Sequence, residues 1–489
     1  MFEQSPRRDF LFQSALGIGS VALGDLLLRN GRARAEDTKN PPVPNPRAPN
    51  PRAPNPRAPN PLAAKQPHFN AKAKHVIFLF MQGGPSQLET FDPKPQMKKF
   101  DGQLLPAELR DFDLAQINTA DAKILAPIFP FSKHGESGVE ISSLFPELAK
   151  HADKLAVIRS CHHNLFIHGS ALTMMHTGTR LLGHPSAGAW VTYGLGAENE
   201  DLPAYIAMTD AMFRNGSATF SSGFLPAIYQ GTYLRTKGAP IQNLQRPAGI
   251  SSRDQRLILD QLGQWNQAHR DERIGDSRLD ARIANYELAF RMQSAAPDLI
   301  DMSKETETTR KMYGLDNEPT AGFGKMCLLA RRMVERGVRY VHLVDADWDA
   351  HGGCKGNHEG QAKKVDQPIA ALLQDLDQRG LLEETLVIWG GEFGRTPIRQ
   401  GNDGRDHHPY GFSMWMAGGG IQGGKVIGAT DDFGFAAVED KVHVNDLHAT
   451  MLSLLGLDHE ALTYFFEGRD FRLTDVGGHN NLADRLTTG

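Results

Sequence analysis

The chain has 489 residues, of which 40% are hydrophobic and 22% are charged, and its formal net charge is −4. This length allows two to four domains, and the charge excludes both the basic footprint of a nucleic-acid-binding protein and an acidic tail. Its three cysteines are too few for a disulfide scaffold, and no CxxC pair indicates a zinc ribbon.

The first 35 residues have the pattern of a twin-arginine export signal. The pair Arg7 and Arg8 precedes a mildly apolar run, and "ARA" at 33–35 offers small residues to a signal peptidase. The alternative is a membrane anchor, which needs about 20 apolar residues, whereas Asp25 interrupts this run. We therefore expect the mature protein to be periplasmic or otherwise exported, with no transmembrane span after removal of residues 1–35.

Residues 36–67 form a predicted spacer. The motif "NPRAP" occurs three times from Asn45 and is followed by "NPLAA". Proline at two of every five positions prevents helix formation and strand pairing, so the segment is expected to be extended and solvated. The folded domain is then expected to occupy residues 68–489.

The folded part alternates buried strands with helices. The run "HVIFLFM" at 75–81 is almost wholly apolar, as in a strand buried on both faces. Similar runs recur at 154–160, 204–209, 338–345, 385–391 and 413–419. Helical periodicity lies between several of them, which predicts an α/β protein with a mainly parallel sheet. Residues 252–312 are polar with a helical pattern and predict an insertion or cap.

Ligands of open α/β sheets gather beyond the carboxyl ends of the strands. After the strand at 338–345, the segment "VDADWDAHGG" contains Asp345, Asp347, Asp349 and His351. Three carboxylates this close repel one another unless a cation or hydrogen bonds offset their charge. Aspartate and histidine form a common ligand set for zinc, manganese or iron. The alternative is a solvated acidic turn.

The strand at 385–391 is followed by "GGEFGRTP". Its glycines let the backbone turn sharply and approach a ligand. Glu392 is then a candidate ligand or base, and Arg395 could bind an oxyanion. The alternative is a structural pair between the two side chains.

Two adjacent histidines, His407 and His408, follow Asp406 just before the strand at 413. Neighbouring side chains of an extended backbone point in opposite directions. One of the two histidines is therefore expected to bind a metal, and the other to support it or to contact substrate.

Two further segments hold candidate residues. "GGPSQLETFDPKP" at 83–95 follows the first strand, and Ser86 or Asp92 there could be functional, although a plain turn is the alternative. Between residues 160 and 186 the chain carries five histidines: His162, His163, His168, His176 and His184. Such density is typical of metal or phosphate-like ligands, with most of the five expected in packing roles.

Four motifs resemble, in sequence and order, those of the exported domain-of-unknown-function family 1501: "GGPSQLETFDPKP", "DWDAHGG", "GGEFGRTP" and "GRDHHPYGFSMWMAGGGIQGG". The resemblance covers about residues 70–475. The family is similar in fold to the alkaline phosphatase and sulfatase superfamily. This implies a three-layer α/β/α sandwich that cleaves phosphate or sulfate esters with divalent metals.

The resemblance also implies ligand positions. They fall on Asp347 or its rival Asp349, His351, Glu392, and His407 or His408. The histidine that follows the later acid in the superfamily is Phe393 here, and no acid stands at 82–84, where the superfamily has an aspartate. These departures imply one metal rather than two, a rearranged site or lost catalysis.

The nucleophile position is also altered. In relatives a Ser, Thr or Cys lies nine positions before a Thr-Gly, and here Thr177-Gly178 leads back to His168, with Ser170 and Thr173 close by. No Cys-x-Pro-Ser-Arg stretch occurs, so a formylglycine sulfatase is not expected.

Together these features predict an exported metal-dependent hydrolase of phosphate or sulfate esters. A divalent ion (zinc, calcium or manganese) would be held among Asp347, Asp349, His351, Glu392, His407 and His408. The candidate catalytic residues are His168, Arg395 and Ser86, with Arg395 neutralising the anionic group. The alternative is a non-catalytic exported protein that uses the same cleft to hold an anionic glycan or a partner.

Overall fold

The computed structural model describes residues 61–109, 121–236, 241, 244–246, 249–271 and 277–487, all of which lie in a unit spanning Asn60–Gly489. The expected signal peptide and the expected spacer up to residue 60 lie outside the described residues. The last part of the expected spacer, 61–67, contacts the folded domain. The Lys65 amide donates to the Leu195 carbonyl at 2.9 Å, and the Ala197 amide donates to the Leu62 carbonyl at 2.8 Å.

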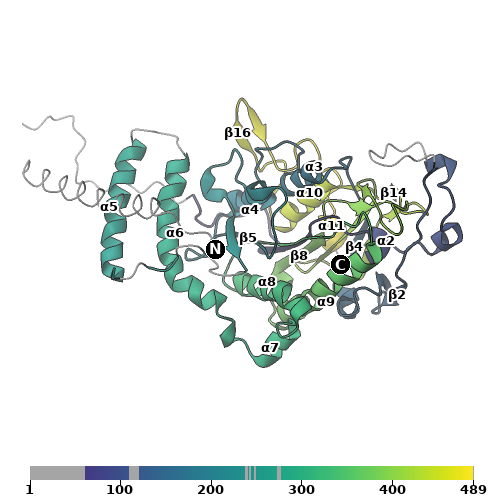
Figure 1. Cartoon of the computed structure of the whole chain (residues 1–489). Helices are drawn as coiled ribbons and strands as arrows, with labels where there is room; N and C mark the ends of the chain where they lie inside the picture. Colours follow the sequence, from purple (N-terminus) through teal and green to yellow (C-terminus); the bar gives the residue numbers. More distant parts are fainter. Residues whose placement is uncertain are drawn as a thin grey trace, which may run out of the picture. The chain divides into compact units, whose positions relative to one another are not determined.

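A mainly parallel sheet forms the middle layer of the domain, as the strand pattern predicts (Figure 1). Its strand order in the described part of the chain is β12-β4-β11-β8-β1-β7-β5-β6, with β15 beside β4. The strands are β1 (His75–Met81), β4 (Ala156–His162), β5 (Tyr205–Thr209), β6 (Thr232–Arg235), β7 (Tyr340–Asp345), β8 (Thr385–Gly390), β11 (Phe412–Ala417), β12 (Lys425–Ile427) and β15 (Val442–His443). Strand β11 runs antiparallel to β4 and β8, and the other pairs are parallel.

Helices cover both faces of this sheet (Figure 1). One face packs against α8 (Glu318–Val334), α9 (Cys354–Gln378) and η4 (Leu148–Lys154). The other packs against α3 (His168–Thr177), α4 (Ala187–Leu195), α10 (Val444–Leu454) and α11 (Ala483–Thr487). The predicted three-layer α/β/α sandwich is therefore confirmed.

Strand β1 shows why the sequence produces these layers. All seven of its residues are buried. Because side chains alternate across a strand, Ile77 and Leu79 enter the core on one face, whereas Phe78 and Phe80 enter the core on the other. A continuous apolar run is what a strand needs when helices cover both of its faces.

The polar region around 252–312 is helical. It contains α5 (Ser252–Asp271), α6 (Ser277–Ile300), η7 (Met302–Lys304) and α7 (Glu307–Met312). Helices α5 and α6 are joined by a bidentate pair in which Arg256 donates to both oxygens of Glu287, at 2.9 and 2.7 Å. Across the described residues, no helix has both the length and the apolar character needed to cross a membrane.

Short hairpins and turns complete the domain. The small antiparallel pairs are β2 (Phe131–His134) with β3 (Val139–Ser142), β9 (Gly394–Arg395) with β10 (His407–His408), β13 (Ala429–Thr430) with β14 (Ala437–Glu439), and β16 (Tyr464–Phe466) with β17 (Arg469–Phe471). The short helices are α2 (Gln87–Thr90), η1 (Pro95–Phe100), η2 (Ala107–Leu109), η5 (Gly216–Phe220), η6 (Ala227–Tyr229) and η8 (Leu382–Glu384).

Candidate metal centre

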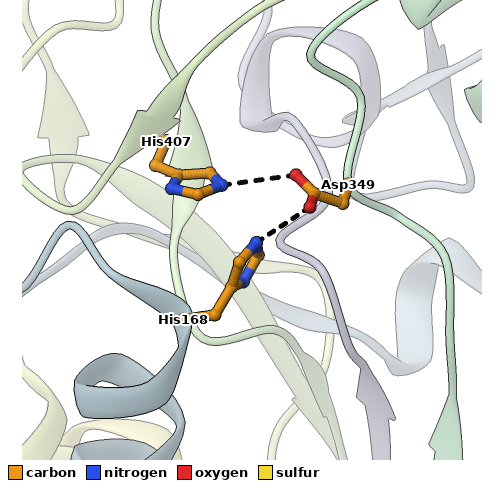
Figure 2. Close-up of side chains that lie close together, drawn as sticks. All are labelled: His168, Asp349 and His407. Carbon is orange, nitrogen blue, oxygen red and sulfur yellow. Dashed lines mark hydrogen bonds and ion pairs between the residues drawn. The ribbon is translucent and has the colours of Figure 1, made fainter. Parts of the chain in front are cut away.

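Several distant chain segments meet at the carboxyl end of the central strands. Strands β7 and β8 both flank β1, so the loops that follow them start close together. The loop after β7 carries Asp349 and His351, and β10 pairs with β9 so that His407 lies opposite Arg395. His168 is the first residue of α3. Figure 2 shows His168, Asp349 and His407 facing one another.

The carboxylate of Asp349 is the centre of this cluster. Its Oδ2 lies 3.0 Å from His168 Nε2, and its Oδ1 lies 3.1 Å from His351 Nε2 and 3.3 Å from His407 Nε2. Burial alone would raise the pKa of Asp349. Hydrogen bonds with His168 and His407 and the charge of Arg395 outweigh burial and hold this pKa well below its ordinary value.

Each of the three imidazoles is oriented through its Nδ1 atom. His168 Nδ1 contacts Glu392 Oε1 at 2.6 Å, His407 Nδ1 contacts the Phe166 carbonyl at 2.8 Å, and His351 Nδ1 contacts Gln400 Oε1 at 2.8 Å. Because all three partners are oxygen acceptors, they favour the tautomer that carries its proton on Nδ1. The lone pairs of the three Nε2 atoms are then directed into the cluster.

This arrangement fits a divalent cation. His351 Nε2 and His407 Nε2 lie 2.9 Å apart, and both face the Asp349 carboxylate. Lone pairs this close repel one another and the carboxylate unless a proton or a cation lies between them. Among the described residues, two groups of side chains could hold a metal ion: His168, Asp349 and His407, and His351, Asp406 and His407. Both belong to one continuous cluster because His407 is common to them.

The pKa values of the two best-buried rings of the cluster shift in opposite directions. Burial lowers the pKa of His168, but hydrogen bonds with Asp349 and Glu392 outweigh it, so this pKa lies above its ordinary value. For His407 burial is the larger effect, and its pKa is lowered although Asp349 partly offsets the shift. His168 is therefore the ring that holds a second proton more readily, between two carboxylates.

Glu392 contacts His168 at Nδ1, whereas Asp349 contacts the same ring at Nε2. Its side chain is fully buried, and both of its oxygens accept from the Gly83 amide, at 3.0 and 3.1 Å. Gly83 has a φ of +119°, and a Cβ there would lie 2.6 Å from the Asp349 amide nitrogen, so the close approach of these two loops requires glycine. Glu392 thus orients His168, whereas its place in the sequence predicts a direct metal ligand.

Arg395 links Asp349 to the backbone of the neighbouring loops. The side chain is fully buried. It donates to the carbonyls of Gly83, Gly84 (2.9 Å) and Arg405 (3.2 Å), and to Asp349 Oδ1 at 2.7 Å. The sequence predicts that Arg395 binds the substrate anion. Its donors instead bind backbone carbonyls and Asp349, so the guanidinium is not placed to do so.

Three other predicted residues lie outside the cluster. Asp347 is exposed and has a φ of +76°, and its carbonyl accepts from Asn357. His408 is fully buried with Nε2 against the Phe435 carbonyl, because neighbouring residues of β10 point to opposite sides. Ser86 is also fully buried, and its hydroxyl has no hydrogen-bond partner among the described residues. The structure therefore does not bring these three to the metal centre.

Arg214 is a site residue that none of the sequence motifs indicates. Its NH1 lies 3.2 Å from Asp349 Oδ2, and its side chain is 34% exposed. The buried side chain of Gln82 fixes its loop, because Oε1 accepts from the Arg214 amide at 2.9 Å and Nε2 donates to the Met212 carbonyl at 3.1 Å. Its position in the sequence could have identified it, because Arg214 lies in the loop that follows β5, a parallel strand of the same sheet.

Comparison with known proteins places the chain in a family. Residues 73–485 match a family described as "Protein of unknown function (DUF1501)", and no curated protein matches the chain in sequence. Among solved structures, the chain is similar to the lipoteichoic acid synthase LtaP from Listeria monocytogenes, with 10% identity, 86% of this chain and 79% of that chain covered, and a TM-score of 0.37.

Two further solved structures are similar to the chain. One is the PsFucS1 sulfatase from Pseudoalteromonas sp., with 12% identity, 83% of this chain and 72% of that chain covered, and a TM-score of 0.32. The other is the alkaline phosphatase from the Antarctic bacterium TAB5, with 8% identity, 79% of this chain and 99% of that chain covered, and a TM-score of 0.33. Because the family match extends over most of the sequence, the chain belongs to the DUF1501 family of proteins of unknown function.

Proposed function

We propose that the protein is a metal-dependent hydrolase of phosphate or sulfate esters. His168, Asp349, His351 and His407 would hold the ion. The observation that carries the proposal is that three imidazoles have their Nδ1 atoms bonded to oxygen acceptors while their Nε2 atoms converge on one carboxylate. A cation is the simplest species that satisfies such a donor set.

The ligand atoms of the cluster favour some of the three candidate metals, zinc, calcium and manganese, over the others. Three imidazole nitrogens and one carboxylate suit zinc and related transition metals. Calcium, in contrast, prefers six to eight oxygen ligands. We therefore propose zinc or a similar ion at this site. When bound, such an ion supplies Lewis-acid polarisation of an ester oxygen and lowers the pKa of a bound water.

The chain itself supplies orientation and charge. Glu392 holds the ring of His168, and Arg395 holds the carboxylate of Asp349. Arg214 is the half-exposed cation of the cluster, and we propose that its guanidinium binds the anionic part of the substrate. No described serine, threonine or cysteine side chain hydrogen-bonds a side chain of this cluster, which favours water over a side chain as the attacking group.

The decisive experiment combines metal analysis with activity. The full chain and its His351→Ala variant would be purified, analysed for bound metal, and assayed on aryl phosphates and sulfates with added zinc, calcium or manganese. We expect bound zinc and turnover in the wild type, and loss of both in the variant. His134→Ala in β2 is the matched control, because His134 belongs to neither potential metal-binding group. Absence of bound metal in the wild type would refute the proposal.

The rival function is that of a non-catalytic exported protein that binds an anionic glycan or a partner. The observation in its favour is the lack of a hydroxyl nucleophile bonded to the cluster among the described residues. The same experiment separates the two functions, because a binding protein would retain metal and bind a sulfated or phosphorylated ligand without turnover of any ester.

We also propose that the protein is exported by the twin-arginine route. The support is the order of Arg7, Arg8 and the mild apolar run in the sequence. Cell fractionation of the wild type and of an Arg7→Lys, Arg8→Lys chain tests the route. Equal amounts of the two chains in the periplasm would contradict it.

A further inference from the structure

We propose that Asn357 and Gln361 of helix α9 are positioning residues for the metal ligand Asp349, and that their bonds strengthen the binding of the ion. This inference rests on the proposed function and adds residues that lie outside the ligand cluster. Its basis is a series of side-chain bonds from one face of α9 to the short stretch of chain between the end of β7 and Asp349.

Two amide side chains of α9 bond successive carbonyls of this stretch. Asn357 Nδ2 donates to the Asp347 carbonyl at 2.7 Å, and Gln361 Nε2 donates to the Ala346 carbonyl at 2.8 Å. Residues four positions apart lie on the same face of a helix, so both amides reach the stretch together. Because the acceptors are backbone atoms, these bonds fix the path of the chain just before Asp349.

A third side chain of the same face, Lys364, acts on the last residue of β7. Its ammonium group pairs with the carboxylate of Asp345, which is fully buried. The other oxygen of Asp345 accepts from the indole N–H of Trp348 at 2.9 Å, and the Trp348 amide donates to the Gln82 carbonyl at 3.2 Å. The residue directly before Asp349 is therefore held by both its side chain and its backbone.

The backbone of Asp347 shows why the stretch needs to be held. Its φ is +76°, in the left-handed region that residues with a Cβ seldom adopt. Such a conformation persists only where the surrounding structure maintains it. Asp347 lies two positions before Asp349, so its dihedral angles decide the direction in which the ligand enters the cluster. The bond from Asn357 to the Asp347 carbonyl opposes relaxation to an extended conformation.

A ligand that is already in place binds an ion without first ordering its loop. If the stretch before Asp349 relaxed, only the fraction of molecules with the carboxylate in position would be competent to bind, and the apparent affinity would fall by that fraction. Residues that orient metal ligands from outside the ligand set typically change affinity by about 10- to 100-fold. Asn357 and Gln361 are expected at the lower end of this range, because each contributes one of several bonds to the stretch.

The first test compares two glutamines of α9 in the full chain. Gln367 Nε2 donates to the carbonyls of Lys311 and Met312 in α7, at 3.0 and 3.2 Å, so Gln367→Ala removes the same kind of bond away from the metal centre. Both Gln361→Ala and Gln367→Ala are expected to lower the stability of the metal-free chain, measured by chemical unfolding in excess chelator. Only Gln361→Ala is expected to weaken zinc binding, by about tenfold in competition with a chromogenic chelator.

The second test uses rescue by glycine. Asn357→Ala is expected to weaken zinc binding by about tenfold. It is also expected to change the visible spectrum of bound Co²⁺, which depends on the geometry of the ligands. Glycine adopts a positive φ without strain, so in a chain that carries Asp347→Gly the further change Asn357→Ala is expected to weaken zinc binding by less than about threefold.

The outcomes separate this inference from the proposed function. Equal zinc affinities in Gln361→Ala and Gln367→Ala, with zinc still bound by the wild type, overturn the inference and leave the metal-dependent hydrolase standing. A loss on Asn357→Ala that is as large in the Asp347→Gly chain as in the wild type overturns the assignment of Asn357. The expected losses of affinity without turnover of any ester support the inference and remove the hydrolase. A wild type that binds no zinc overturns both.

Discussion

At the scale of single residues, side chains of the same type occupy opposite environments. Asp349 contacts three imidazoles and two guanidiniums, whereas Asp347 is exposed. Arg395 is fully buried against backbone carbonyls, whereas Arg214 is half-exposed on a loop after another strand. The role of an acid or a base here depends on what surrounds it, because burial and partners decide which charges are neutralised.

This contrast gives a paired prediction. Asp349→Asn is expected to weaken zinc binding by about 100-fold or more, because it removes the carboxylate on which three imidazoles converge. Asp347→Asn is expected to change the affinity by less than about twofold, and asparagine tolerates the positive φ at this position. Competition with a chromogenic chelator measures both affinities. Equal losses in the two variants would contradict the assignment of Asp349.

At the scale of elements, the site depends on short pieces of strand. Strand β10 has two residues, and it pairs with β9 so that His407 lies opposite Arg395 and His408 lies opposite Gly394. Alternation along the strand sends the His407 ring into the cluster and the His408 ring toward the Phe435 carbonyl. One histidine therefore serves the site, and its neighbour serves the packing of the hairpin.

Because the two histidines of the hairpin have different partners, we predict that substituting His407 lowers metal affinity and that substituting His408 lowers stability. His407→Gln is expected to reduce metal affinity with little change in the stability of the metal-free chain. His408→Gln is expected to lower the free energy of unfolding by about 1–3 kcal/mol, because it disturbs a fully buried ring and its hydrogen bond. Metal titration and chemical unfolding, each performed on both variants, check the pair. A large loss of metal binding in His408→Gln alone would reverse the assignment.

At the scale of the whole molecule, many imidazoles are buried in the sandwich. Desolvation lowers the pKa of six buried rings, to about 4 for four of them, to about 3 for His358, and well below the ordinary value for His342. The four with a pKa of about 4 are His163, His176, His408 and His448. These rings stay neutral in the folded chain at a pH where the unfolded chain protonates them.

We therefore predict that acidification destabilises the protein. Between about pH 6.5 and pH 4 the unfolded state binds more protons at these histidines, so the free energy of unfolding falls as pH falls, by about 1.4 kcal/mol per pH unit for each net proton. Burial raises the pKa of three acids and opposes this trend: Asp92, Asp345 (to about 6) and Asp366 (to about 6). The six histidines outnumber the three acids, so the free energy of unfolding is still expected to fall as pH falls.

Chemical unfolding in excess chelator, at several pH values from 7 to 5, measures this slope without a contribution from metal release. The midpoint concentration of denaturant is expected to fall steadily with pH. A midpoint that is constant or that rises on acidification would show that the buried imidazoles do not dominate the titration.

Some of the site was predictable because it depends on local order. Ligands in this fold class follow the strands, so the loops at 347–351 and 405–408 were identified from their position in the sequence. The convergence of His351 and His407 follows from that rule and from the pairing of β9 with β10. The role of Arg214 was not predictable from the sequence. It depends on a hydrogen bond from the Arg214 amide, in the loop after β5, to the Gln82 side chain, which follows β1.

The amino-acid sequence by itself determined the layers, the family and the neighbourhood of the site, because apolar runs and strand ends are properties of consecutive residues. Only the tertiary structure decided which of Asp347 and Asp349, and which of His407 and His408, points inward. It also showed that Glu392 contacts His168 and that Arg395 donates to Asp349. The reason is geometric: a side chain's role depends on the few ångströms between segments that are distant in the chain, and no local pattern encodes those distances.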